Sequence, residues 1–158
     1  MTALDNAGNL SSFSYDAKIS GACVYSLKKA SVIDFCQMTP TTYGICTQNS
    51  IQVIDSLLHP KRQTVFKVST NQAPLCLDYF SQTKLSICRK TDMLIYDTRM
   101  DVLQESRDLQ GKVKCMATNY KNRLLVGKTD NKVRVVDVTG VGAENDYDVK
   151  VSGKGGEG

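Results

Sequence analysis

The chain has 158 residues, of which 41% are hydrophobic, 23% charged and 7% aromatic, and it contains no tryptophan. Twenty basic residues against 16 acidic residues give a net charge of +4, a surplus too small to indicate nucleic-acid binding by itself. The longest apolar runs, Ala22–Tyr25 and Met93–Tyr96, are far shorter than a membrane-spanning helix requires.

Six cysteines occur without a Cys-x-x-Cys pair. The first residues also lack the basic and then apolar segments of a secretory signal. Disulfides form and persist mainly in exported proteins, so we expect reduced thiols and an intracellular chain, cytoplasmic or nuclear.

Short runs of alternating or continuous apolar residues, separated by polar turns, predict β-strands along the whole chain. The expected strands are, in order, Met1–Asp5, Leu10–Asp16, Ala22–Leu27, Val32–Cys36, Tyr43–Cys46, Ile51–Asp55, Thr64–Val68, Leu75–Tyr79, Leu85–Cys88, Met93–Asp97, Val102–Ser106, Val113–Met116, Leu124–Gly127, Val133–Asp137 and Tyr147–Val151.

Four of these strands end in an aspartate and form an internal repeat. Asp16, Asp55, Asp97 and Asp137 are separated by 39, 42 and 40 residues. A period near 40 residues with strand-like patterning is typical of propeller blades, whereas helical repeats show apolar spacings of three and four. We expect these blade-terminal aspartates to accept hydrogen bonds from neighbouring turn amides or hydroxyls.

The predicted fold is therefore all-β: a propeller segment with three complete four-stranded blades and a partial first blade. The blade units are 1–27, 31–68, 73–106 and 112–151, within a domain of residues 1–152 followed by a flexible Gly-rich tail, 153–158. The first unit lacks an innermost strand. We expect the propeller to be completed by another segment or chain, or by self-association, because open blade faces and edges favour association.

The cysteines support the same alignment of the repeats. Cys36, Cys76 and Cys115 fall in the first strand of successive units, while Cys46 and Cys88 each lie nine residues before a closing aspartate. Free cysteine packs as a small hydrophobic residue. A metal or redox site is the alternative, but close cysteine pairs or neighbouring histidines, which mark such sites, are missing.

The four repeats resemble the WD40 family of β-propellers, whose blades close with Trp-Asp. Here Tyr15, Ile54, Tyr96 and Val136 occupy the Trp position, and the Asp is kept. The family's Gly-His pair is missing, and the single histidine, His59, lies elsewhere. A narrower similarity, to spindle-checkpoint and mRNA-export propellers, rests on residues 122–127 and 132–137. The resemblance implies a non-enzymatic scaffold or adaptor that binds other proteins.

Basic side chains at the blade turns are the candidate partner-binding residues: Lys61, Arg62, Arg89, Lys90, Lys128 and Lys132. If they converge on one rim, they would attract acidic peptides, phosphorylated ligands or nucleic acid. Scattered solubilising charge is the alternative. Arg99 is a further candidate, because Tyr96–Arg99 resembles the Trp-Asp-x-Arg box with which some WD40 proteins dock onto ubiquitin-ligase adaptors.

Other motifs indicate neither an enzyme nor a cofactor or metal site. Gly127-Lys128-Thr129 lacks the upstream glycine and the following helix of a phosphate-binding loop. The lone His59 stands beside a proline in a polar loop, and the 144–148 acidic cluster lacks the spacing of a calcium loop. We expect that cluster to be a solvated turn.

Overall fold

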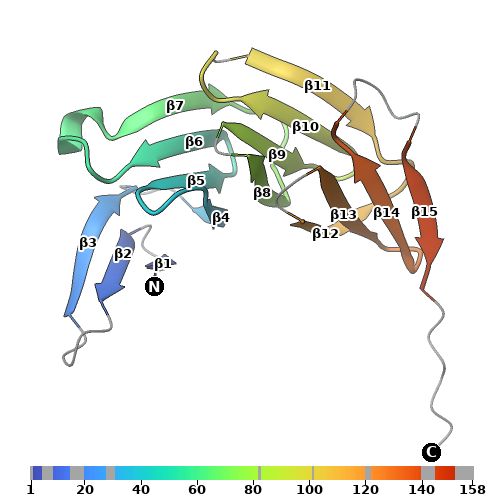
Figure 1. Ribbon diagram of the computed structural model, residues 1–158, viewed down its shortest axis with the longest axis horizontal. Helices are drawn as coiled ribbons and strands as arrows, with labels where there is room; N and C mark the ends of the chain where they lie inside the picture. The colour runs from blue at the N-terminus through green and yellow to red at the C-terminus, as the bar shows by residue number, and fades with distance from the viewer. Residues whose placement is uncertain are drawn as a thin grey trace, which may run out of the picture.

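The computed structural model describes residues 2–4, 9–14, 20–27, 31–81, 83–100, 102–119, 122–139 and 145–151. Its strands form four antiparallel sheets, and Figure 1 shows these sheets following one another along an arc. No helix within the described residues is long and apolar enough to cross a membrane.

The elements follow one another in the order β1 (Thr2–Leu4), β2 (Asn9–Ser14), β3 (Ser20–Ser26), β4 (Val32–Gln37), β5 (Thr42–Thr47), β6 (Ser50–Asp55), the 3-10 helix η1 (Pro60–Arg62), β7 (Thr64–Ser69), β8 (Cys76–Ser81), β9 (Lys84–Cys88), β10 (Asp92–Asp97), β11 (Val102–Asp108), β12 (Val113–Thr118), β13 (Arg123–Lys128), β14 (Lys132–Asp137) and β15 (Tyr147–Lys150).

The all-β prediction is confirmed, with a three-stranded sheet β1–β3 and three four-stranded sheets β4–β7, β8–β11 and β12–β15. We call these sheets the first to fourth blades. Within each four-stranded blade, consecutive strands are neighbours, as in a meander. The predicted strand ends differ from the observed ends by one or two residues. Tyr15, Asp16 and the predicted tail 153–158 lie outside the described residues.

The middle strands of a blade supply side chains to two different cores. In β10, Leu94 and Tyr96 pack toward the second blade, whereas Met93 and Ile95 pack toward the fourth blade. All four are buried. Successive side chains of a strand point to opposite faces of its sheet, so a continuous apolar run is what a strand covered on both faces requires.

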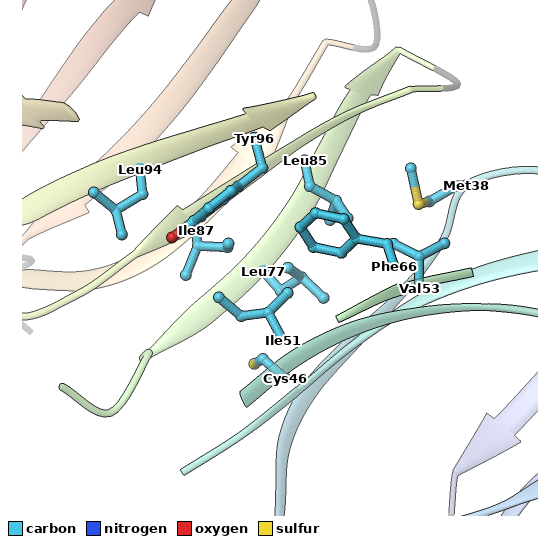
Figure 2. Close-up of a cluster of buried hydrophobic side chains, with 10 residues drawn as sticks. All are labelled: Met38, Cys46, Ile51, Val53, Phe66, Leu77, Leu85, Ile87, Leu94 and Tyr96. Atoms are coloured by element: carbon cyan, nitrogen blue, oxygen red, sulfur yellow. The ribbon is translucent and has the colours of Figure 1, made fainter. Parts of the chain in front are cut away.

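Figure 2 shows the core between the second and third blades. Phe66 of β7 meets Tyr96 of β10 edge to face, with ring centroids 5.9 Å apart and an interplanar angle of 64°. Such an aromatic pair contributes about 0.5–1.5 kcal/mol beyond its buried area. The buried members of this core are Met38, Cys46, Ile51, Val53, Phe66, Leu77, Leu85, Ile87, Leu94 and Tyr96.

The core between the third and fourth blades has the same construction. Leu124 and Val126 of β13 are fully buried against Met93 of β10. The buried members are Cys76, Phe80, Cys88, Met93, Ile95, Leu109, Val113, Leu124, Val126 and Val136. A smaller core of Leu27, Tyr43, Ile45 and Ile54 joins the first and second blades.

Two glycines allow close packing near the innermost strands. A Cβ on Gly127 would lie 2.7 Å from the Cys115 sulfur, and one on Gly44 would lie 3.0 Å from Leu85 Cδ2. Real Cβ atoms almost never approach other atoms as closely as the first of these distances. Small residues are therefore required where the cysteines of the innermost strands pack.

Two aspartates of the innermost strands join each blade to the next. Asp34 of β4 accepts a hydrogen bond from the Leu77 backbone N–H at 2.9 Å, and Asp78 of β8 accepts one from the Thr118 N–H at 3.1 Å. Burial raises the pKa of Asp78 above its ordinary value, although the N–H groups that it binds oppose this shift. We call these contacts the inter-blade clamps.

The described cysteines, all of them unpaired thiols, differ in exposure: Cys46, Cys76 and Cys88 are buried, Cys36 is partly buried and Cys115 is exposed. Burial raises the pKa of Cys46 to about 12. Because the thiolate is the reactive form, a buried thiol with a raised pKa reacts slowly.

Native thiol labelling followed by mass mapping tests this arrangement. We expect Cys115 to react first, and Cys46 and Cys88 to react only as the protein unfolds, because the blades on either side cover them. Denatured protein, in which every cysteine should react, is the control. Labelling of native Cys46 as fast as that of Cys115 would contradict the packing of the blades.

Candidate functional site

The blades have two ends with different chemistry. We call the end where β6, β10 and β14 finish the closing end, and the end with the β5–β6, β9–β10 and β13–β14 turns the hairpin end. Since these strands run the full height of a blade, the two ends face opposite directions. Each predicted binding residue can therefore be assigned to one end.

The closing aspartates make the same turn in all three four-stranded blades. Asp55 accepts a hydrogen bond from the Leu57 N–H at 3.0 Å, Asp97 from the Arg99 N–H at 3.0 Å, and Asp137 from the Thr139 N–H at 2.9 Å. This is an Asx turn, in which the side chain binds the backbone two residues further on. The repeated aspartate therefore orders the chain as it enters the outermost strand.

The Asp97 turn also holds an arginine. Arg99 donates from Nε to Asp97 Oδ1 at 3.2 Å and from Nη2 to Oδ2 at 2.8 Å. The hydrogen bonds from the Arg99 side chain lower the pKa of Asp97. Asp97 is buried, but 65% of the Arg99 side chain remains exposed. Arg99 is thus at the surface, with its guanidinium oriented by a carboxylate.

Lys61 and Arg62 also lie at the closing end. Both are exposed and belong to η1, which follows Asp55. His59 begins this helix, and its Nδ1 accepts a hydrogen bond from the Lys61 N–H at 3.3 Å. The histidine thus has a local structural contact in the loop where the sequence analysis placed it.

The other four predicted basic residues lie at the hairpin end. Lys90 is exposed, Lys132 pairs with Asp130 at 3.3 Å, and Arg89 pairs with Asp92 across its turn. The six basic turn residues therefore do not converge on one rim, because the strands carry Lys61 and Arg62 to one end of the blades and the other four to the opposite end.

Lys128 requires a further correction, because it is not a surface residue. Its side chain is 1% exposed, and Nζ donates to the carbonyl oxygens of Leu109 and Gln110, each at 3.2 Å, and to Asp148 at 2.9 Å. These contacts use its three donors. Lys128 therefore fastens the fourth blade to the segment that follows β11 and offers no free charge to a partner.

The described part of the acidic cluster, residues 145–148, also contacts the third blade. Asp146 accepts hydrogen bonds from Arg107 Nη1 at 3.1 Å and from the Asp137 N–H at 3.0 Å, and its side chain is buried. Arg107 also donates to the Asp137 carbonyl at 2.6 Å. The expectation of a solvated turn is therefore wrong for Asp146. Its arginine partner lies 39 residues earlier in the chain, so no local sequence pattern indicates the pair.

A groove of about 390 Å³ opens at the closing end between the third and fourth blades. Its walls come from β8–β11 and from the segment after β14: Phe80, Lys84, Ile95, Val102, Leu103, Gln104, Glu105, Val138 and Thr139. Val102 and Leu103 are about half exposed. The volume and the walls, which combine apolar side chains with Lys84, Gln104, Glu105 and Thr139, suit a side chain or short segment of a partner.

None of the seven predicted basic residues lines this groove. The groove has no local sequence pattern, because its walls combine side chains from two blades. The signal available in the sequence was the apolar pair Val102-Leu103, placed directly after a closing turn and at the start of an exposed outer strand.

The Asp97 turn leads to a prediction on stability. Asp97→Ala should cost about 1–3 kcal/mol of unfolding free energy, because it leaves the N–H of Arg99 and its guanidinium without their acceptor. Asp97→Asn should cost less, because it keeps an acceptor for the N–H. Asp130→Asn, at an exposed ion pair, is the control and should change stability by less than about 0.5 kcal/mol.

The pH dependence follows from the lowered pKa of Asp97. A carboxyl whose pKa is lower in the native than in the unfolded protein stabilises the fold. This stabilisation is fully present at pH values above the pKa of the unfolded protein, about 3.9. The difference in unfolding free energy between wild type and Asp97→Asn should therefore have its full size at neutral pH. It should disappear as the pH falls through the native pKa, and a difference that grows on acidification would contradict this account.

Comparisons with known proteins indicate a fold. No protein-family model matches the chain, and no curated protein matches it. Among solved structures, Raptor of Chaetomium thermophilum matches with a TM-score of 0.70 at 17% identity, over 94% of this chain and 15% of the Raptor chain. The present chain thus spans about 15% of the length of that neighbour. The likeness shows that this chain has a β-propeller-like fold.

Proposed function

We propose that the chain is a non-enzymatic protein-interaction module with WD40-type blades, acting as a scaffold or adaptor. The groove at the closing end between the third and fourth blades would receive an apolar side chain of a protein partner. The observation that carries this proposal is the groove itself, with half-exposed Val102 and Leu103 in its wall. Loops held by rigid sheets are the usual place for such binding.

The WD40 assignment within the proposal rests on two features of the blades. Ile54, Tyr96 and Val136 occupy the family's Trp position and are buried, and each is followed by a closing aspartate that makes the same turn. The β-propeller-like fold shown by the match to Raptor agrees with this assignment at the level of fold.

The partner chemistry follows from the walls of the groove. Val102, Leu103 and Val138 favour an aliphatic or aromatic side chain, whose burial is worth about 1.5–3 kcal/mol. Lys84 in the same wall and Arg99 in the turn before β11 favour a carboxylate beside that side chain, because Glu105, the acidic residue of the wall, is already paired with Arg107. We therefore propose a short peptide segment that combines an apolar anchor with an acidic neighbour.

Binding of nucleic acid or phosphorylated ligands through a basic rim is less well supported. Lys61, Arg62 and Arg99 share the closing end, but Arg89, Lys90 and Lys132 lie at the hairpin end and two of these pair with aspartates. Docking of Arg99 onto a ubiquitin-ligase adaptor stays a proposal, in which its guanidinium would have to bind Asp97 and the adaptor together. The unpaired described thiols favour an intracellular location.

Selection of short random peptides on the immobilised chain tests the proposed function. We expect enriched peptides with an apolar residue beside an acidic one, and a loss of affinity of about tenfold or more in Leu103→Lys. Leu57→Lys, also exposed but outside the groove, is the matched control and should bind normally.

Salt distinguishes the two kinds of binding. Affinity for the selected peptides should fall only modestly with ionic strength, because one charge contact accompanies the apolar anchor, whereas contacts to many phosphates weaken steeply as salt rises. Enrichment of peptides that bind Leu103→Lys as well as wild type would contradict a role for the groove. Tight, salt-sensitive binding of a single-stranded oligonucleotide in place of peptides would support the electrostatic alternative.

A further inference from the structure

Two cysteines of the third blade lie opposite each other in neighbouring strands. Cys76 begins β8, Cys88 ends β9, and the register pairs them directly. Residues directly opposite each other in antiparallel strands have Cα atoms about 4.5–5.5 Å apart. Disulfides join residues whose Cα atoms are about 4.4–6.8 Å apart. The two strands therefore hold these cysteines at a separation that a disulfide can span.

The other described cysteines of the four-stranded blades face residues that form no disulfide: Cys36 lies opposite Gly44, Cys46 opposite Asp34 and Cys115 opposite Gly127. Cys46 has the same place in the second blade as Cys88 in the third, nine residues before the closing aspartate. Both thiols are fully buried, and Figure 2 shows Cys46 in its core. Cys46 is therefore a natural comparison for Cys88, equal in burial but without a second thiol opposite.

The two thiols of the third blade differ in acidity. A hydrogen bond from the Cys88 thiol lowers the pKa of Cys76, although burial and the carboxylates of Asp34 and Asp78 oppose this shift. The same hydrogen bond raises the pKa of Cys88, and burial adds to the effect. Since the thiolate is the nucleophile, Cys76 is the more reactive of the two, and Cys88 keeps its proton.

The two thiols also differ in access. Cys76 is 9% exposed and directly follows Leu75, which is 44% exposed, whereas Cys88 is fully buried. The Cys88 thiol also donates to the Met116 sulfur of the fourth blade at 3.4 Å, so it lies inside the interface between the two blades. A small oxidant from solvent should therefore react with Cys76 first. Redox-active pairs commonly combine an accessible thiol of low pKa with a resolving thiol beside it.

We propose that Cys76 and Cys88 form a peroxide-sensitive dithiol, whose oxidation joins β8 to β9 by a cross-strand disulfide. Cys76 would be the thiol that reacts with peroxide, and Cys88 the thiol that resolves the product. The proposal does not depend on the peptide groove, whose walls contain no cysteine among the described residues.

The reaction balances with hydrogen peroxide as the oxidant. The Cys76 thiolate attacks one peroxide oxygen, the O–O bond breaks, and the leaving hydroxide takes up the proton that the Cys76 thiol released. Cys76 is then a sulfenic acid. The Cys88 sulfur attacks the Cys76 sulfur, the S–O bond breaks, and the Cys88 proton leaves with the hydroxyl group as water. In total, two thiols are oxidised to one disulfide and hydrogen peroxide is reduced to two molecules of water.

Oxidation would act on the contact between two blades. The disulfide removes the Cys88 S–H that donates to Met116, so one contact between the third and fourth blades is lost. A dithiol reductant would restore it by thiol–disulfide exchange. Local sequence gives no sign of this pair, because Cys76 and Cys88 are twelve residues apart and only the β8–β9 hairpin brings them together.

Peroxide treatment of the native chain, followed by mass mapping, tests the proposal. The purified protein is treated with hydrogen peroxide, freed of the excess, unfolded and alkylated. We expect the peptides of Cys76 and Cys88 to be joined by a disulfide that dithiothreitol cleaves. Cys46 should still be alkylated as a reduced thiol. Circular dichroism before and after treatment shows that the chain stays folded during the reaction.

Single variants assign the two roles. In Cys88→Ser, Cys76 should remain a sulfenic acid that dimedone traps, because its resolving thiol is missing. In Cys76→Ser, Cys88 should stay reduced. Cys46→Ser is the matched control and should form the disulfide as wild type does. Circular dichroism melting identifies a variant that fails to fold, and the corresponding alanine variant then replaces it.

Two outcomes would overturn the proposal. The first is oxidation of Cys46 or Cys115 while Cys76 and Cys88 both remain reduced. The second is oxidation of Cys88 as fast in Cys76→Ser as in wild type, because peroxide would then react with the buried thiol without its neighbour.

Discussion

Burial of both faces of the middle strands is the constraint on which the rest of the structure depends. In the third blade, Leu85 and Ile87 pack toward the second blade, and Met93 and Ile95 pack toward the fourth. Truncating one such Leu or Ile to Ala in a packed core costs about 2–5 kcal/mol. A blade of this kind is not stable alone, because each of its faces needs a neighbouring sheet.

The interfaces between neighbouring blades differ in composition from the innermost to the outer strands. Near the innermost strands, glycines and cysteines allow close approach, and Asp34 and Asp78 bind backbone N–H groups of the next blade. Farther out, the interface between the second and third blades contains the Phe66–Tyr96 pair. The interface between the third and fourth blades contains the buried Arg107–Asp146 pair. A buried ion pair adds little net stability compared with apolar packing, but losing one partner is costly. Substitution of one residue should therefore destabilise the interface between the third and fourth blades more than the interface between the second and third.

The fold could be predicted from the sequence to a large extent, because its signals are local. Alternation along each strand, turns between strands and an aspartate at each closing position all act within a few residues, and they recur with the period of a blade. The observed strands accordingly match the predicted ones, with small differences at their ends.

The candidate site could be predicted far less well, because its contacts join residues distant in sequence. Lys128 looked like a rim residue, yet its ammonium binds Asp148, 20 residues later. Asp146 pairs with an arginine of the previous blade, and the groove takes its walls from two blades. Charged residues at turns have no local pattern that distinguishes a buried ion pair from a solvated side chain.

The central claim, that consecutive blades pack face to face through their alternating side chains, is tested most directly by a double-mutant cycle on Phe66 and Tyr96. These residues are 30 positions apart in different blades, and only blade packing brings their rings to 5.9 Å. With each residue changed to Leu singly and together, the unfolding free energies should show a coupling of about 0.5–1.5 kcal/mol. Additive effects, with no coupling between two substitutions that each destabilise the protein, would contradict the face-to-face packing of these blades.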